Sequence, residues 1–304
     1  MRTTLCALAA AGWAGLLLTT GCGGAPAVGG SGSLREGLGL PQLAVAGTPY
    51  EMGWHHGRLL AERIRAVLAA PVAGEAAGMY PAYAAGMRAL LPPAVEEELR
   101  GIAAGAGVSA DDLFLREAAR DARRWHDARA ARLSGTVLTN AGDTLVMAAY
   151  EPVERAAVPP LVVISRRPSG GTPTLVLAWP GSLGAIAGSS AKGVRAAQVE
   201  DGEVAPEQRT LKAVPFAVGF RLALERATDA ASFATDLHGL VGNRIAVADA
   251  AGGTRLGLVR FQGDPPQEAG LVTRRENLFA APGETYVAVT SDGLRVGDVT
   301  YTAP

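Results

Sequence analysis

The segment LSGTVLTNAGDTLVMAAYE, residues 133–151, decides the fold of this chain. Residues 135–139 and 144–150 are rich in β-branched and apolar side chains, and residues 140–143 supply turn residues between them. This pattern predicts a β-hairpin. Every strong periodicity before the segment is helical, whereas short apolar strands and turns dominate after it. We therefore expect the sheet core to begin here.

The helical half opens with GTPYEMGWHHGR. Thr48 is a good N-cap, Pro49 suits the first helical position, and Glu51 completes a capping box. Gly53 and Gly57 share a face with the apolar residues of this helix, which lets another backbone come close. Further helices are predicted over residues 79–91, 94–104 and 109–125.

Two adjacent histidines lie in the first helix, His55 and His56. His56 falls on the apolar face, with no Cys, Asp or Glu at ligand spacing, so we predict a packed, hydrogen-bonded role for it. The other histidines, His126 and His238, also lack the spacing of a metal site. No metal and no other cofactor is predicted.

Downstream of the hairpin, the pattern alternates between strands and helices. Strands are predicted in PLVVISRR, TLVLAWPG and the glycine-rich stretch 181–200. Two amphipathic helices follow over 214–227 and 229–241, and a second hairpin is predicted over 243–261. The order of helices, strands, helices and strands, with short connections, predicts a layered α+β body.

Composition narrows the function. The chain has 304 residues and a mass of 31.0 kDa, and 48% of its residues are hydrophobic, which is ample for a buried core. Arg and Lys number 28 against 29 Asp and Glu, so the formal net charge is −1. Because no basic field is present and only 5% of residues are aromatic, we expect no nucleic-acid partner.

Residues 1–22 have the pattern of a secretory signal, with a basic residue near the start and an apolar run. The end of this segment resembles a bacterial lipobox, which implies cleavage before Cys22 and its lipidation; an ordinary signal peptide is the alternative. Export to the cell envelope and a lipid anchor in the membrane are expected. Since Cys6 is the only other cysteine and leaves with the signal, a cysteine nucleophile is excluded. Residues 23–40 are rich in Gly and Ser and are predicted to be a flexible tether.

Several motifs resemble those of one enzyme family. GTPYEMGWHHGR resembles the opening helix of the acyl-coenzyme A:6-aminopenicillanate acyltransferase family, the C45 peptidases of the N-terminal-nucleophile hydrolase superfamily. GSSAKGV, RLALERA and GNRIAVADAAG resemble its later motifs in the same order. The resemblance implies an αββα sandwich over 133–304, preceded by a helical segment over 48–126, within one domain of residues 41–304. The part from Phe261 matches less well and is expected to be shortened or diverged.

The resemblance also implies a chemistry. In this family the precursor cleaves itself before a cysteine, whose thiol attacks an amide or ester carbonyl while its own α-amine acts as the base. The position of that cysteine falls on Leu133 or Ser134 in this sequence. Ala148 and Ala149 stand where the family has Arg and Asn, and Glu151 stands where it has Asp. Serine is a competent N-terminal nucleophile when its amine is free.

Two hypotheses follow for the function. In the first, Ser134 acts on the amide or ester of a small acylated molecule or peptide, with Glu151, Ser190 and Asn243 in support. Ser190 falls at the position of an oxyanion asparagine, and Asn243 is retained in GNR. In the second, the protein keeps the fold and an acyl-binding cleft as a binding domain of the cell envelope. This second hypothesis arises because losing one oxyanion donor costs a factor of roughly 10²–10³ in rate.

Overall fold

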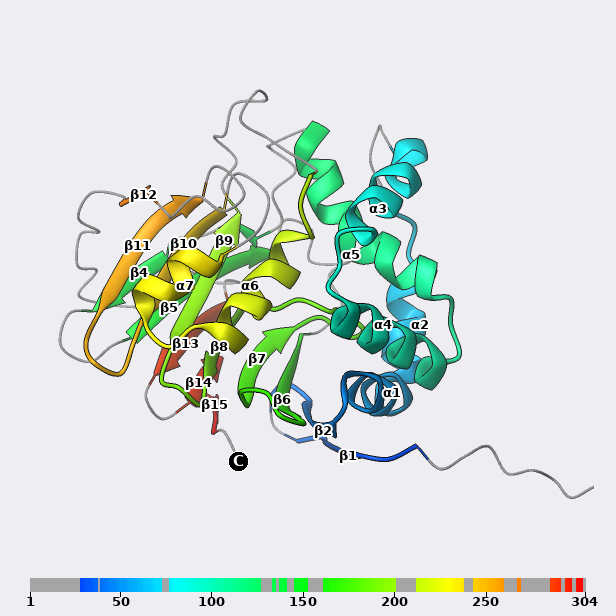
Figure 1. Cartoon of the computed structure of the whole chain (residues 1–304), viewed down its shortest axis with the longest axis horizontal. Helices are drawn as coiled ribbons and strands as arrows, with labels where there is room; N and C mark the ends of the chain where they lie inside the picture. Colours follow the sequence, from blue (N-terminus) through cyan, green and yellow to red (C-terminus); the bar gives the residue numbers. More distant parts are fainter. Residues whose placement is uncertain are drawn as a thin grey trace, which may run out of the picture.

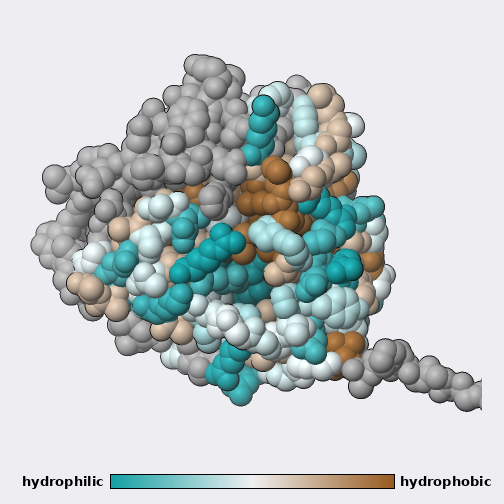
Figure 2. Space-filling model, viewed as in Figure 1, coloured by the Kyte–Doolittle hydropathy of each residue, from teal (hydrophilic) through white to brown (hydrophobic). Residues whose placement is uncertain are grey.

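The computed structural model describes residues 28–37, 39–72, 77–126, 133–134, 137–140, 145–152, 161–200, 212–237, 243–259, 267–268, 285–290, 293–296 and 299–302. These residues form a layer of helices and two β-sheets (Figure 1). In Figure 1 helices α1–α5 gather on one side of the molecule, while α6 and α7 lie across the larger sheet. Figure 2 shows a hydrophobic patch near the place where α5 faces α6, with hydrophilic side chains around it.

The helices before the hairpin form close to where they are predicted. They are α1 (Pro49–Leu59), α2 (Ala61–Ala69), the 3₁₀ turn η1 (Ala77–Met79), α3 (Tyr80–Arg88), α4 (Pro93–Ala106) and α5 (Ala110–His126). The capping box of α1 is confirmed, since the backbone N–H of Thr48 donates to Glu51 Oε2 at 2.8 Å and that of Glu51 donates to Thr48 Oγ1 at 3.4 Å. Local side-chain chemistry therefore fixes the start of this helix.

The larger sheet has nine strands in the order β1-β2-β6-β7-β8-β9-β10-β11-β12. Their bounds are β1 Ser31–Arg35, β2 Gln42–Gly47, β6 Val162–Pro168, β7 Thr174–Ala178, β8 Ala187–Ser190, β9 Arg195–Glu200, β10 Asn243–Ala248, β11 Thr254–Val259 and β12 Gln267–Glu268. Neighbouring strands are antiparallel except β2 and β6, which are parallel. The parallel pair joins the N-terminal strands to the rest of the sheet.

The second sheet contains the hairpin that opens the core. Its strands are β3 (Leu133–Ser134), β4 (Val137–Asn140), β5 (Leu145–Pro152), β13 (Thr285–Thr290), β14 (Gly293–Val296) and β15 (Val299–Tyr301). The predicted hairpin is confirmed, because β4 and β5 are antiparallel from Val137 opposite Ala148 to Asn140 opposite Leu145. Strand β13 pairs with β5, so the weakly matching C-terminal part supplies strands of this sheet.

Alternating side chains of the larger sheet face two different layers. Val162 and Ile164 of β6 pack with the helices, whereas Val163 between them packs against β13 and β14 of the second sheet. The helices on the first face include α6 (Phe216–Arg226) and α7 (Ala230–Asp236), which confirm the predicted late pair. The α+β class is thus confirmed as a helical layer on a pair of stacked sheets.

The predicted tether is wrong for residues 31–35. These residues form β1, which pairs antiparallel with β2 from Ser31 opposite Ala46 to Arg35 opposite Gln42. Leu34 of this strand packs against the core. The Gly- and Ser-rich composition suggested flexibility, but a partner strand in the fold supplies the backbone hydrogen bonds that composition cannot reveal.

Helices α1 and α4 touch through glycines, as the spacing of Gly53 and Gly57 predicted. A Cβ atom on Gly57 would lie 2.1 Å from the carbonyl oxygen of Ile102, and one on Gly53 would lie 2.2 Å from that of Glu98. On α4, Gly101 and Gly105 approach α1 equally closely. The two backbones therefore pack at a distance that only glycine permits.

Candidate functional site

The candidate nucleophile and the candidate acid are direct cross-strand neighbours. Strand β3 pairs antiparallel with β5, so that Ser134 lies opposite Glu151 and Leu133 opposite Pro152. Residues opposite each other in an antiparallel pair have Cα atoms about 4.5–5.5 Å apart and point to the same face. The structure describes the backbone of Ser134 and Glu151, and this backbone brings the two residues together.

Asn243 belongs to the other sheet. It is the first residue of β10, where it lies opposite Glu200 of β9. Strand β3 contacts β9 across the gap between the two sheets. Strand β10, which begins at Asn243, pairs with β9. Asn243 and Ser134 therefore lie on strands that both contact β9.

Ser190 lies elsewhere. It ends β8, and its backbone N–H donates to the carbonyl oxygen of Val194 in the turn that leads into β9. Asn243 lies opposite Glu200, six residues after Val194, a separation of about 20 Å at ~3.3 Å per residue. The backbone therefore does not bring Ser190 and Asn243 to one place, because the hairpin of β8 and β9 puts them at opposite ends of neighbouring strands.

The neighbour of Ser190 on the adjacent strand is another buried residue with a hydroxyl group. Thr174 of β7 lies opposite Ser190, and the two side chains are 4% and 7% exposed. Thr174 in turn lies opposite Arg166 of β6, so the three residues form one row across the sheet. This row leads to a group of buried charges that the sequence did not single out.

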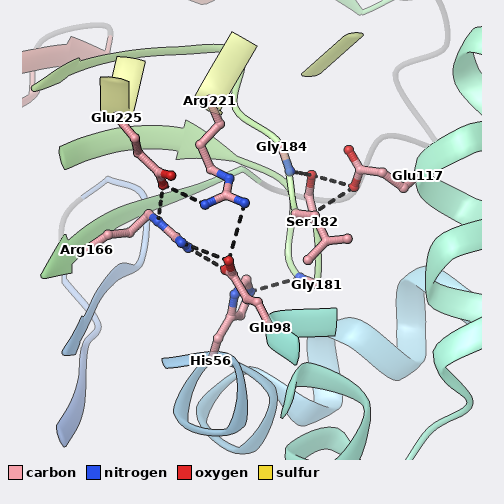
Figure 3. A network of polar contacts seen from close by, with 10 residues as sticks. His56, Glu98, Glu117, Arg166, Gly181, Ser182, Gly184, Arg221 and Glu225 are labelled. Atoms are coloured by element: carbon pink, nitrogen blue, oxygen red, sulfur yellow. Dashed lines mark hydrogen bonds and ion pairs between the residues drawn. The ribbon is translucent and has the colours of Figure 1, made fainter. Parts of the chain in front are cut away.

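The buried charges form a network between the helices and the sheet (Figure 3). Glu98 of α4 accepts two hydrogen bonds from Arg166, with Oε1 2.5 Å from Nη1 and Oε2 2.9 Å from Nη2. Nη2 of Arg221 on α6 lies 3.3 Å from Glu98 Oε2. The side chains of these three residues are at most 4% exposed. The carboxylate is thus held between two guanidinium groups.

A second carboxylate balances the charge of the network. Glu225 Oε1 accepts from Arg221 Nη1 at 2.6 Å and lies 3.4 Å from Arg166 Nε. Glu225 is the most exposed member, at 20% of its side chain. Two cations face two anions, as buried charges require if they are not to be neutralised.

The network shifts the pKa values of its members. Burial by itself raises the pKa of Glu98, but the charges of Arg166 and Arg221 outweigh burial and bring it down to about 2. Burial favours the neutral form of Arg166, but Glu98 and Glu225 outweigh that effect and raise its pKa. Glu98 and Arg166 are therefore both ionised at neutral pH.

His56 has the packed role predicted for it. Its side chain is 1% exposed, and Nε2 accepts a hydrogen bond from the backbone N–H of Gly181 at 3.1 Å. Burial is the main reason that its pKa falls from 6.5 to about 4; Glu98 opposes this shift, and Arg166 and Arg221 add to it. The imidazole is therefore neutral at neutral pH, as its role as an acceptor requires.

We expect His56 to make the protein less stable as the pH falls. The unfolded chain binds a proton at His56 near pH 6.5, and the folded chain binds it only near pH 4. The free energy of unfolding is therefore unaffected by this group above pH 6.5 and decreases as the pH falls from 6.5 toward 4. At about 1.4 kcal/mol per pKa unit, the loss amounts to about 3 kcal/mol. His56→Gln keeps an acceptor for Gly181 but has no such titration.

Urea unfolding at a series of pH values measures this loss. The difference in free energy of unfolding between the wild type and His56→Gln should shrink or reverse between pH 6.5 and pH 4. Parallel pH profiles for the two proteins would contradict the assignment.

A second set of polar contacts holds the loop after β7. Oε2 of Glu117 on α5 accepts from Ser182 Oγ at 2.8 Å and from the backbone N–H of Leu183 at 3.1 Å. The N–H of Gly184 donates to Ser182 Oγ at 3.0 Å. The hydroxyl proton of Ser182 is thus directed at a carboxylate, and the loop is fixed against α5 (Figure 3).

The sequence held a signal for this network. Glu98 lies among Val95, Leu99 and Ile102 on the apolar face of its helix, and Arg221 lies within the apolar run FAVGFRLALER. A charge on a face that must be buried needs a buried partner. The pattern identifies the charged residues, but only the fold shows how they pair.

Other kinds of site find no support in the described part of the chain. No group of three His, Cys, Asp or Glu side chains there could hold a metal ion. None of the helices described is long and apolar enough to cross a membrane.

Fold and site together define an α+β protein with two stacked sheets, a paired Ser134 and Glu151, and a buried charge network. No protein-family model and no curated protein matches the sequence.

Proposed function

We propose that this chain is an exported amide or ester hydrolase of the N-terminal-nucleophile type. It would be held at the membrane by a lipid on Cys22 and act on an acylated small molecule or peptide. The observation that carries the proposal is the pairing of Ser134 with Glu151 at the end of β3 and β5. This pairing supports the proposal because the acid Glu151 would then lie beside the α-amine released by cleavage after Leu133.

The chemistry needs only groups of this chain and water. After cleavage, the free α-amine of Ser134 takes the proton of Oγ as Oγ attacks the substrate carbonyl. The tetrahedral intermediate expels the amine or alcohol, which receives that proton, and leaves an ester on Ser134. Water, deprotonated by the same α-amine, then hydrolyses the ester and restores the serine. Glu151 would orient the ammonium form, and the amide of Asn243 would donate to the oxyanion.

The two stacked sheets support the proposal of an αββα sandwich, the fold in which this mechanism occurs. The nine-stranded and six-stranded sheets pack through residues such as Val163 and Val287, and a helical layer covers the nine-stranded sheet. The proposed αββα sandwich adds a second helical layer over the six-stranded sheet. In the superfamily that the motifs resemble, the nucleophile begins a strand of such a sandwich; Ser134 is the second residue of β3 here, and cleavage after Leu133 would make it the first.

A specific observation favours the second candidate, a binding domain without catalysis. Ala148 and Ala149 occupy the positions of the family's Arg and Asn, and they lie opposite Val287 and Tyr286 of β13. An alanine places neither a charge nor an amide beside the nucleophile. If several supporting groups are lost, the fold remains suited to holding an acyl group, while turnover becomes slow.

The substitution Ser134→Ala separates the two candidates. The mature wild-type chain is expected to give two fragments that meet between Leu133 and Ser134, and the variant a single uncut chain without turnover of acyl amides. Intact mass under denaturing conditions measures the cleavage. Ser182→Ala is the matched control, since its hydroxyl already donates to Glu117, and it should still be cut. An uncut wild-type chain, or an active Ser134→Ala variant, contradicts the hydrolase proposal.

A further inference from the structure

Helix α1 carries a row of surface side chains that the proposed reaction does not use. Tyr50, Trp54 and Arg58 are spaced four residues apart, so they lie along one side of the helix. Tyr50 and Arg58 are exposed, Tyr50 at 38%, and Trp54 is partly buried. The guanidinium group of Arg58 lies over the Trp54 ring, 5.0 Å from its centroid. These three residues are called the α1 stripe below.

The chemistry of the α1 stripe fits the surface of a lipid bilayer. Tryptophan and tyrosine, which join an apolar ring to a polar tip, are enriched where a membrane meets water. Arginine can lay its apolar stem along the boundary and hold its charge at the lipid phosphates. Figure 2 also shows a small hydrophobic patch at the edge of the molecule where α1 and the start of β1 lie.

The N-terminal chain joins the fold beside this same helix. His55 Nε2 donates to the carbonyl oxygen of Gly29 at 3.1 Å. A Cβ atom on Gly29 would lie 2.3 Å from Glu51 Oε1, so the backbone at Gly29 runs close against α1. Strand β1 begins two residues later and packs on α1 (Figure 1). The chain is therefore fixed to the fold from Gly29 onward.

The tether that precedes this point is short. Gly29 lies seven residues after Cys22, the expected site of the lipid. An extended chain spans at most 3.3–3.6 Å per residue, so Cys22 lies within about 25 Å of Gly29. Helix α1 has 11 residues and is about 16 Å long. A lipid that inserts at Cys22 thus keeps the whole α1 stripe within reach of the headgroups.

A short tether makes even a weak surface contact effective. Once the lipid has inserted, contact between the α1 stripe and the bilayer is an intramolecular step. Short linkers give such steps effective concentrations in the millimolar range. The α1 stripe therefore needs little affinity of its own, and three side chains suffice.

We infer that the α1 stripe docks on the surface of a phospholipid bilayer. The rings of Tyr50 and Trp54 lie at the level of the headgroups, and Arg58 contacts the lipid phosphates. The inference rests on the lipid on Cys22 that the proposed function includes, and it does not depend on hydrolysis. The protein is then held with α1 and β1 against the membrane.

The test attaches the lipid chemically. Once Cys6 has left with the signal, Cys22 is the one cysteine of the chain, so a maleimide-bearing phospholipid couples there alone. The vesicles contain phosphatidylethanolamine and phosphatidylglycerol, with some spin-labelled headgroups that quench tryptophan fluorescence. We expect the anchored protein to be quenched, and Trp54→Phe should remove most of that quenching.

Trp125→Phe is the matched control. Trp125 is also exposed, at 37%, but it lies at the C-terminal end of α5, which Figure 1 places at the other end of the helical layer from α1. This variant should keep most of the quenching. Circular dichroism checks that both variants are folded. Equal losses in the two variants, or a larger loss in Trp125→Phe, would overturn the inference.

Arg58→Glu separates docking from mere proximity. The tether is unchanged in this variant, but the charge next to the lipid phosphates is reversed. The ratio of docked to undocked protein should fall about fivefold or more on these vesicles. Arg226→Glu makes the same change in net charge at the exposed end of α6 and should have little effect. Equal quenching of the wild type and Arg58→Glu would show that the tether alone brings Trp54 near the lipid, which would overturn the inference.

Two further outcomes keep this inference distinct from the proposed function. A natural chain without a lipid on Cys22, shown by its intact mass, would refute the proposed anchor, whereas the chemically anchored protein still decides whether the α1 stripe docks. A dimer of the unanchored chain that Arg58→Glu dissociates would assign the α1 stripe to a second copy of the protein and overturn the inference.

Discussion

Replacing Glu98 with alanine is expected to lower the free energy of unfolding by about 3–5 kcal/mol. The carboxylate is shared by Arg166 and Arg221, and all three side chains are at most 4% exposed. Without it, two guanidinium groups remain buried with Glu225 as their shared anion. Urea unfolding followed by circular dichroism at pH 7 measures the loss.

The control for this prediction is the same substitution at Glu96, which lies on the same helix. Its ion pair with Arg88 is about a quarter to a third exposed on both sides, so Glu96→Ala should cost less than about 1 kcal/mol. The lowered pKa of Glu98 gives a further check. The stabilisation by the ionised carboxylate is complete above pH 4.5 and is lost as the pH falls toward 2. The free energies of unfolding of the wild type and Glu98→Ala should therefore converge in strongly acidic buffer. Equal losses for the two alanine variants at pH 7 would show that the network stabilises nothing.

The second large effect is expected from Gly101→Ala in α4. A Cβ atom at this position would lie 2.2 Å from the carbonyl oxygen of Tyr50 and 2.9 Å from the backbone nitrogen of Trp54. Because backbone atoms cannot turn aside as a flexible side chain can, α1 and α4 must move apart. We expect a loss of about 3 kcal/mol in the free energy of unfolding, measured by thermal and urea unfolding.

Gly86→Ala tests whether that loss is due to packing. Gly86 lies in α3, is exposed, and has no atom within 4 Å of where its Cβ would be. Alanine there should stabilise the protein by up to about 1 kcal/mol, since it favours the helix more than glycine does. The same substitution in two helices is thus expected to act in opposite directions. Stabilisation by Gly101→Ala would mean that the two helices do not pack through their glycines.

The sequence determined the features that depend on neighbours along the chain. Thr48 and Glu51 cap a helix because they are three residues apart, and the hairpin of β4 and β5 follows from alternating apolar residues around a turn. The pairing of Ser134 with Glu151 continues that same hairpin. The candidate nucleophile and its acid could therefore be placed together from the sequence.

Only the tertiary structure decided what depends on residues far apart in the chain. The distance of Ser190 from Asn243 is one example, because an alignment of motifs does not show where β8 turns back into β9. Strand β1 needed β2 as its partner, and Glu98 needed Arg166, 68 residues away. A buried charge is stable only if an opposite charge comes within hydrogen-bonding distance, and that distance is set by the packing of helices on the sheet.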